Sequence, residues 1–287
     1  MKILTDSASD MPFEERQRLG IAIAPLFIQF PEGEVNSEDI SADDFYNRLE
    51  AMRPQIPTTA QPSAGIFAEM YRKLTETGED VLSVHISSGL SGTIQSARVG
   101  AEQVSNSLIH LVDTMTLSGG ERFQVLAAAL MKRAGRSREF ILERLDKIRA
   151  STELIYTLET LEYLARGGRI GRVQALAGML LRIKPIINVD KSDGKYSTVG
   201  KERTIQRAIE TIGDHLVNLY GNTTPMWITV LHGRFAEQAD RMAELLQQKL
   251  QVGKLEILRI SPVLGVHTGP GIVGVAAVPM SLMEGLE

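Results

Sequence analysis

The sequence predicts an α/β protein of two domains, and two patterns along its 287 residues support this. Short apolar segments, typical of buried strands, alternate with longer segments of helical periodicity, which indicates βαβ units around a mainly parallel sheet. The pattern changes near residue 150, after which Asp193-Gly194 between two apolar segments indicates a hairpin. We therefore expect a three-layer α/β/α domain with a parallel sheet over residues 1–152, and a two-layer α/β domain with a mixed sheet over residues 153–287.

Capping and turn residues position the elements of the first half. Ser or Asp before a helical segment suits the N-cap, because its side chain accepts a hydrogen bond from the first turn. On this basis Asp10 caps the first helix and Gly20 ends it, whereas residues 56–63, with two prolines, are a loop. The expected strands are residues 3–5, 21–30, 81–86 and 108–112. The expected helices begin near residues 10, 41, 63 and 92, and two more occupy residues 118–150.

The second half mixes strand directions. A helical segment at residues 160–182 is interrupted by Gly167-Gly168, since glycine weakens a helix interior. The strands at residues 186–189 and 196–199 form the two arms of the expected hairpin. The other expected strands are residues 154–158, 227–231, 255–260 and 272–278, with helices between them.

The composition excludes several classes of function. With a formal net charge of −4, the chain lacks the basic character typical of nucleic-acid binding. It contains no cysteine, which excludes disulfides, thiol catalysis and cysteine zinc sites. No apolar run approaches the roughly 20 residues of a membrane helix, and the acidic Asp6 comes too early for a signal peptide. We expect a cytoplasmic protein without integral membrane association.

A loop rich in hydroxyl groups and glycine, residues 87–93, follows an expected strand and precedes a helix. Ligands of open α/β sheets bind at the carboxyl ends of strands, and the free backbone N–H groups at the start of a helix suit an anion. The hydroxyl groups add donors, and Gly89 and Gly92 let the backbone approach a ligand. The loop therefore predicts an anion site, with a simple N-capping turn as the alternative.

Two enzymatic interpretations of this loop are weaker. A phosphate-binding P-loop needs a lysine, and the loop has none. A nucleophile elbow, Gly-x-Ser-x-Gly, is approached at residues 89–93, but Thr93 stands where the last glycine belongs. None of the five histidines lies in a recognisable triad motif. A serine hydrolase or acyltransferase that uses Ser91 stays as the alternative function, with an anion-binding regulator as a third.

Four other polar segments could reach a ligand. Thr59 lies in a second hydroxyl-rich loop, and Asp6 ends the first strand. Arg169 belongs to a basic, glycine-containing segment at residues 164–172, which indicates either a solvated turn or contact with an acidic group. His267 lies in a glycine-rich turn before the last strand, where a lone histidine is more often structural.

Six segments, taken in order, resemble the DegV family of bacterial lipid-binding proteins. They are residues 5–7, 58–63, 87–96, 113–114, 161–171 and 265–271. Each segment is a weak signal alone, but their order and spacing across the whole chain make the combination specific. One departure is Ala60, where many relatives carry serine, which removes one hydroxyl beside Thr59.

The resemblance implies a fatty acid such as palmitate or oleate, held in a buried apolar tunnel between the two domains. It places the carboxylate on Thr59 and Ser91, and it implies no catalytic residue, no metal and no cofactor besides the bound lipid. The residues that it places at the pocket mouth are Asp6, Gly92, Thr93, Arg169 and His267. In the family such a protein is the binding subunit of a fatty acid kinase, whose separate ATP-binding subunit phosphorylates the presented carboxylate for phospholipid synthesis.

Two expectations follow for the ligand. The long acyl chain should set affinity and the hydroxyl groups should set orientation, because burial of many methylene groups outweighs two hydrogen bonds. Uncharged donors would also leave the carboxylate reactive toward ATP, whereas a close lysine or arginine would stabilise it. The apolar residues expected to line the tunnel are Phe27, Phe67, Ile94, Leu158, Leu176, Met179, Leu180 and Ile187.

Overall fold

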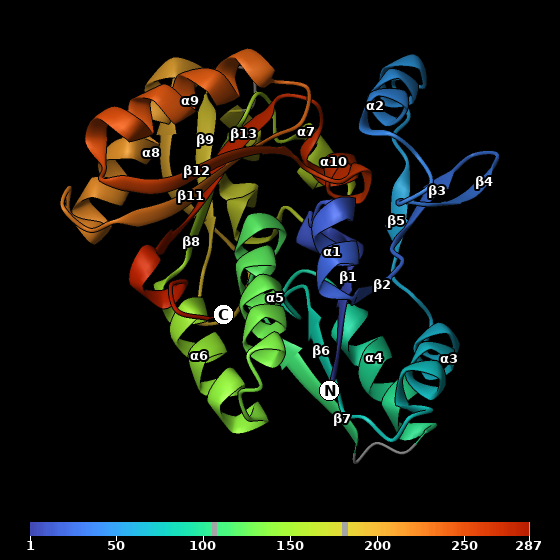
Figure 1. Ribbon diagram of the computed structural model, residues 1–287. Helices are drawn as coiled ribbons and strands as arrows, with labels where there is room; N and C mark the ends of the chain where they lie inside the picture. The colour runs from blue at the N-terminus through green and yellow to red at the C-terminus, as the bar shows by residue number, and fades with distance from the viewer. Residues whose placement is uncertain (105–107, 180–182, 287) are drawn as a thin grey trace.

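The computed structural model describes residues 1–104, 108–179 and 183–286, the side chains of residues 176–179 excepted. Its N-terminal part is built on a parallel sheet with the strand order β2-β1-β6-β7 (Figure 1). These strands are β1 (Lys2–Asp6), β2 (Ile21–Ala24), β6 (Val81–His85) and β7 (Ile109–Asp113). Helices α3 (Ala64–Thr75) and α4 (Thr93–Glu102) pack together on one face, and α5 (Ser118–Arg133) packs on the other. This is the predicted three-layer arrangement.

A small antiparallel sheet, β4-β3-β5, was not predicted; with α2 (Ala42–Ala51) it stands to one side of the molecule (Figure 1). The single strand expected at residues 21–30 is two strands, because Pro25 and Leu26 separate β2 from β3 (Phe27–Phe30). The loop expected at residues 56–63 contains β5 (Thr58–Ala60), which pairs with β3, as does β4 (Gly33–Asn36). The prolines lie outside these three residues, so they do not prevent the pairing.

The C-terminal part is a mixed sheet with the order β10-β9-β8-β13-β11-β12, in which only β11 and β12 are parallel. The strands are β8 (Glu153–Leu158), β9 (Lys184–Val189), β10 (Tyr196–Glu202), β11 (Met226–His232), β12 (Val252–Arg259) and β13 (Ile272–Pro279). Helices α8 (Ile205–Tyr220) and α9 (Ala236–Lys249) cover one face. The fold class is thus the predicted one, and the predicted hairpin is β9-β10. The exact domain boundary at residue 152 stays a prediction.

Two of the expected helix caps are confirmed and a third is wrong. Ser41 and Ser63 cap α2 and α3 as expected, but Asp10 does not cap α1 (Phe13–Leu19). Its carboxylate instead accepts from Ser118 Oγ of α5 and, at 2.7 Å, from the backbone N–H of Ser261. Burial raises the pKa of Asp10 to about 6. The remaining short elements are η1 (Ser7–Ser9), α6 (Arg138–Ser151), α7 (Glu162–Arg166), η3 (Gly171–Met179), α10 (Pro262–Thr268) and η4 (Met280–Leu282).

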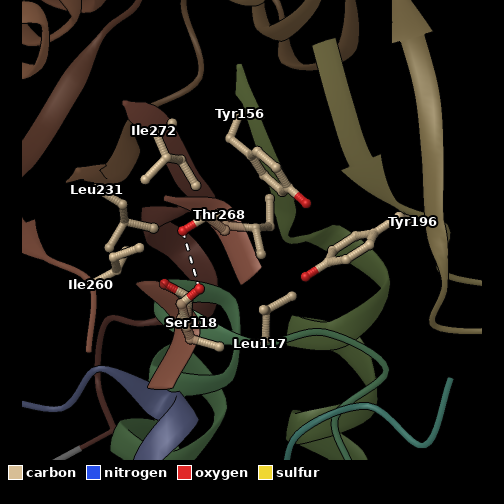
Figure 2. A pocket seen from close by; sticks show the side chains of 11 residues that line it. Leu117, Ser118, Tyr156, Tyr196, Leu231, Ile260, Thr268 and Ile272 are labelled. Atoms are coloured by element: carbon tan, nitrogen blue, oxygen red, sulfur yellow. Dashed lines mark hydrogen bonds between the residues drawn. The ribbon is translucent and has the colours of Figure 1, made fainter. Parts of the chain in front are cut away.

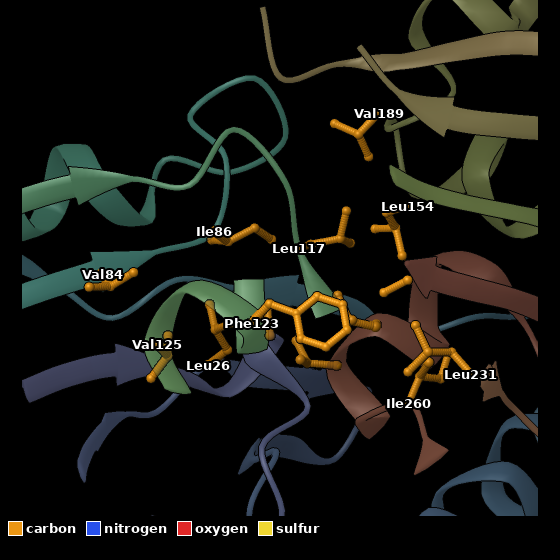
Figure 3. Packing of buried hydrophobic residues seen from close by; sticks show 14 of the residues in the cluster. Leu26, Val84, Ile86, Leu117, Phe123, Val125, Leu154, Val189, Leu231 and Ile260 are labelled. Carbon is orange, nitrogen blue, oxygen red and sulfur yellow. The ribbon is translucent and has the colours of Figure 1, made fainter. Parts of the chain in front are cut away.

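Helix α5 lies between the two large sheets, and all of its residues from Ser118 to Met131 are buried. Figure 3 shows Leu117 and Phe123 between apolar residues of the N-terminal part, such as Ile86, and residues of the C-terminal sheet, such as Leu154 and Leu231. The Phe123 ring also meets that of Trp227 edge to face, with centroids 5.6 Å apart. Both sheets therefore contribute to one apolar cluster around α5, besides a separate cluster under α8 and α9 and another under α3 and α4.

Two charged residues of α5 are buried at this contact. The side chain of Arg122 is only 2% exposed and reaches Glu15 of α1 at 2.7 Å and Glu256 of β12 at 2.9 Å. Glu121 accepts a hydrogen bond from Thr5 Oγ1 at 3.1 Å. Burial, and then the charge of nearby Asp6, raise the pKa of Glu121 well above its ordinary value, which favours the uncharged carboxyl. The sequence pattern gave no sign that these residues are internal.

Candidate functional site

A cavity that we call the polar chamber brings together four of the seven predicted site residues: Thr59, Ser91, Arg169 and His267. They come from β5, the loop before α4, the segment after α7, and α10, which are far apart in the sequence. The space between the lining atoms, solvent at the mouth included, is about 440 Å³. Its apolar lining residues are Ala8, Leu26, Ile86, Leu90, Leu117, Tyr196, Val263 and Leu264.

His267 and Thr59 share a hydrogen bond of 2.8 Å between Nε2 and Oγ1. Burial, and then the charge of Arg169, lower the pKa of His267 to about 3, so the imidazole is uncharged at neutral pH. Gly167 gives the ring its space, because a Cβ there would lie 2.3 Å from His267 Nδ1. Since Nδ1 has no hydrogen-bond partner among the described residues, one ring nitrogen is still available.

Ser91 faces the chamber, while its two predicted neighbours support it from behind. Ser91 Oγ shares a hydrogen bond of 2.8 Å with the buried Thr93 Oγ1. A Cβ on Gly92 would lie 2.6 Å from Gln61 Oε1, so the glycine is needed for contact with protein rather than with ligand. Gln61 Nε2 donates to Ser96 Oγ at 3.0 Å and thereby joins the loop that follows β5 to helix α4. The sequence pattern gave no sign of this bridge.

Gly89 also meets protein rather than ligand, contrary to expectation. A Cβ on Gly89 would lie 2.4 Å from the carbonyl oxygen of Asp193, in the turn of the β9-β10 hairpin. Ser87 Oγ donates to the carbonyl of Gly194 in the same turn at 2.8 Å. The first half of the loop therefore docks on the C-terminal sheet, and only its second half, at Ser91, lines the chamber.

Arg169 differs from the other two arginines of its segment. Arg166 pairs with Glu162, and Arg172 pairs with Asp190 and Asp193. Arg169 Nη1 donates to the backbone carbonyl of Gly167 at 2.8 Å, and within the described ranges it makes no ion pair. Its charge is therefore available to an anion in the chamber. A carboxylate in this chamber would therefore meet a charged donor as well as the uncharged donors expected from the sequence.

Asp6 does not lie at the pocket mouth. It is fully buried and accepts hydrogen bonds from the backbone N–H groups of Ala8 and Ile86, both at 3.0 Å. His85 Nδ1 contacts the same carboxylate at 2.9 Å, and His85 Nε2 contacts Ser83 Oγ at 2.6 Å. Because Ala8 and Ile86 line the polar chamber, Asp6 shapes its wall from inside the protein.

A second cavity, the apolar chamber, adjoins the first and shares Leu117, Leu264 and Tyr196 with it. Figure 2 shows its lining around Tyr156 and Tyr196. The space between the lining atoms, open solvent included, is about 360 Å³. The other lining residues are Ser118, Leu154, Leu231, Ile260, Thr268, Ile272 and Gly274.

None of the expected tunnel residues that the structure describes lines either chamber. Phe27, Phe67, Ile94, Leu158 and Ile187 line neither chamber. Phe67, for example, stacks on Tyr71 with ring centroids 5.8 Å apart, in a separate part of the core. The side chains of Leu176 and Met179, and all of Leu180, lie outside the described residues.

Two other classes of site find no support in the described ranges. No group of three or more histidine, aspartate or glutamate side chains there is arranged to hold a metal ion. None of the helices described has both the length and the apolar character needed to cross a bilayer. The two adjoining chambers differ from other hollows of the described structure in that they hold four of the predicted site residues beside an apolar space.

Comparison with known proteins gives consistent matches over the whole chain. The sequence model described as "Uncharacterised protein, DegV family" matches residues 1–280. A DegV domain-containing protein of Deinococcus radiodurans is 38% identical over 259 residues, which are 90% of this chain and 89% of that protein. A Thermus thermophilus DegV family protein described by its fatty acid binding has 32% identity and a TM-score of 0.90, over 97% of this chain and 99% of that one. A stearic-acid-binding protein of Eubacterium ventriosum has 27% identity and a TM-score of 0.86, over 97% of this chain and 98% of that one.

Proposed function

Since the chain belongs to the DegV family, we propose that it binds one long-chain fatty acid, with the carboxylate in the polar chamber and the acyl chain in the apolar chamber. The observation that carries this proposal is the sharing of Leu117, Leu264 and Tyr196 by the two chambers. A charged end next to a largely apolar space suits an amphipathic ligand. The fatty-acid binding described for the Thermus and Eubacterium proteins supports the same assignment.

We assign the head group to four side chains. Arg169 would pair with the carboxylate, and the hydroxyl groups of Thr59 and Ser91 would donate hydrogen bonds to it. The uncharged His267 would orient Thr59 through their shared hydrogen bond. Each bond to a charged group contributes about 1.5–3 kcal/mol, whereas each buried methylene contributes about 0.8 kcal/mol. The chain should therefore dominate affinity, and the head group should fix its direction.

The test is the lipid that the protein carries and the response of binding to Arg169→Gln. We expect mass spectrometry of the denatured protein to find a fatty acid. We expect Arg169→Gln to weaken stearate binding by about tenfold or more, because the counter-ion is lost. Octadecanol, which has the same chain and no charge, should bind the variant and the parent alike.

Arg166→Gln is the matched control, because Arg166 is exposed, is paired with Glu162 and does not line the chamber. It should leave the affinity for stearate unchanged. Absence of lipid from the purified protein, together with no binding of added stearate or oleate, would contradict the proposal. An equal effect of Arg169→Gln on acid and alcohol would contradict the head-group assignment.

We further propose that the protein is the lipid-binding subunit of a fatty acid kinase in the cytoplasm. Ser91, Thr59 and Arg169 are all partly exposed, so a partner can reach the carboxylate. The sequence has no P-loop motif, so ATP would come with a separate subunit. The product, an acyl-phosphate, would supply phospholipid synthesis.

Ser91→Ala tests this second step. We expect it to reduce acyl-phosphate formation, with an ATP-binding kinase subunit present, far more than it reduces fatty-acid affinity. The reason is that loss of one hydroxyl group leaves the burial of the whole acyl chain in place but removes a donor that orients the carboxylate. Thr93→Ser is a suitable control, because it keeps the hydroxyl that contacts Ser91. Equal losses of affinity and of product would contradict the orienting role.

A serine hydrolase that uses Ser91 is not proposed. Its hydroxyl contacts Thr93, and the nearby His267 contacts Thr59 instead of Ser91. A triad also needs a carboxylate on the second ring nitrogen, and in the described part of the chain His267 Nδ1 has no such partner. Labelling of Ser91 by a fluorophosphonate probe would contradict this conclusion, because it would indicate that Ser91 is a reactive nucleophile.

A further inference from the structure

Two tyrosine hydroxyl groups lie in the apolar chamber, where a purely hydrocarbon ligand gives them nothing to bind. Tyr156 of β8 and Tyr196 of β10 are only 4% and 5% exposed. Figure 2 shows both hydroxyl groups directed toward the same part of the chamber. Tyr156 Oη is buried and has no hydrogen-bond partner among the described residues.

The other hydroxyl groups of the chamber are already used. Ser118 Oγ donates to the carboxylate of Asp10, and Thr268 Oγ1 donates to the carbonyl of Leu264 at 3.1 Å. The tyrosine rings meet edge to face, with centroids 5.8 Å apart. A hydrogen bond between the two tyrosine hydroxyl groups would use only one of their O–H donors. At least one donor is therefore left for an occupant of the chamber.

Both groups remain donors at all physiological pH values. Burial raises the pKa of Tyr196 to about 12. Burial, and then the neighbouring Tyr196, also raise the pKa of Tyr156 well above its ordinary value of 10.0. A phenylalanine would fill the same space without leaving a buried donor unpaired, which is costly in an apolar surrounding.

The backbone is adapted to the position of Tyr156. Its partner across the sheet is Gly274 of β13. A Cβ on Gly274 would lie 2.3 Å from Tyr156 Cβ, so any larger residue would displace the tyrosine. Gly274 itself lines the chamber, and its lack of a side chain leaves room beside the ring.

We infer that the chamber selects a fatty acid that carries an acceptor oxygen, a hydroxyl or oxo group, along its chain. The inference rests on the proposed fatty-acid binding and names a subclass of ligand for the same site. Tyr196 lines both chambers, so the oxygen sits beyond the head group, where the chain passes from one chamber into the other. A site that hydrogen-bonds a ligand oxygen discriminates against the analogue without it, because its own donor is then left unpaired.

The experiment compares stearate with 3-hydroxystearate and 10-hydroxystearate, which carry the oxygen near the head group and at mid-chain. Affinities are measured by calorimetry on delipidated protein, for the parent and for Tyr156→Phe, Tyr196→Phe and the double variant. We expect at least one hydroxy acid to bind the parent about tenfold more tightly than stearate. We expect the double variant to lose that preference, so that it binds neither hydroxy acid more tightly than it binds stearate.

A second measurement does not depend on the choice of ligand. Tyr156→Phe should lower the thermal midpoint of the ligand-free protein little or not at all, because at most one hydrogen bond, to the Tyr196 hydroxyl group, is lost and no buried donor is left unpaired by it. A clear loss of stability would overturn the inference, since it would reveal a protein partner for the hydroxyl group. So would a parent protein that binds stearate as well as both hydroxy acids, or a preference that persists in the double variant. Failure to bind any of the three acids would overturn the fatty-acid proposal itself.

Discussion

Arg122→Ala is expected to lower the free energy of unfolding by about 3 kcal/mol, because removal of one member of a buried ion pair leaves the others without compensation. The guanidinium joins α5 to Glu15 of α1 and Glu256 of β12, with contacts of 2.7 to 3.4 Å. Trp227 Nε1 and Lys254 would still contact Glu256, so its carboxylate keeps two polar partners in the variant. Urea denaturation, monitored by Trp227 fluorescence, measures the effect.

The effect should depend on pH in a defined direction. Burial alone would raise the pKa of Glu256, but the hydrogen bond and charge of Arg122 outweigh burial, and the pKa is about 2. A lowered pKa stabilises the folded state above the ordinary value of 4.5, and this contribution disappears as the pH falls toward 2. The difference in free energy of unfolding between the parent and Arg122→Ala should therefore become smaller as the pH falls from 4.5 toward 2.

Arg18→Ala is the control for this experiment, because Arg18 is an exposed arginine on α1. A change within about 0.5 kcal/mol is expected there. If Arg122→Ala changed the free energy of unfolding equally little, the ion pairs of Arg122 would contribute little to the stability of the contact between the two sheets. If the difference in free energy of unfolding between parent and variant stayed constant down to pH 2, Glu256 would not be the group through which Arg122 stabilises the protein.

Leu264→Trp is expected to abolish most binding of stearate, because Leu264 lines both chambers and a larger ring would close the passage. Each methylene kept out of the protein costs about 0.8 kcal/mol, or roughly fourfold in affinity. Exclusion of only four methylene groups would therefore weaken binding by more than about a hundredfold. Octanoate, which reaches less far, should lose much less affinity. Calorimetry with both acids measures the contrast.

Leu264→Met is the matched control, since it nearly conserves volume and should change stearate affinity little. A thermal melt of each variant checks that the larger ring does not unfold α10. Equal binding of stearate by Leu264→Trp and the parent would mean that the acyl chain takes another path through the protein.

The sequence was most informative where local chemistry decides the outcome. Helix caps such as Ser41 and Ser63, and the hairpin at residues 193–194, depend on neighbouring residues and were predicted correctly. The convergence of Thr59, Ser91, Arg169 and His267 on one chamber also agrees with the predicted set, although their roles stay predictions.

Long-range packing could not be predicted from the same patterns. Periodicity identifies a buried residue but not the surface it meets, so core residues such as Phe67 were mistaken for tunnel lining. Asp6 was placed at the mouth because it ends a strand, but its hydrogen bonds to Ala8 and Ile86 hold it inside. The free charge of Arg169 depends on which arginines find carboxylates, and those carboxylates lie up to 21 residues away.

The burial of α5 between both sheets has a consequence for how the molecule unfolds. Independent folding units need separate cores, whereas here one helix supplies apolar surface to each sheet. Loss of either sheet would remove part of the apolar surface that covers α5 and expose the facing side of the other sheet. We therefore expect the parts before and after the predicted boundary at residue 152 to unfold in one cooperative transition. Both chambers, which are lined from the two parts, would be lost in that transition.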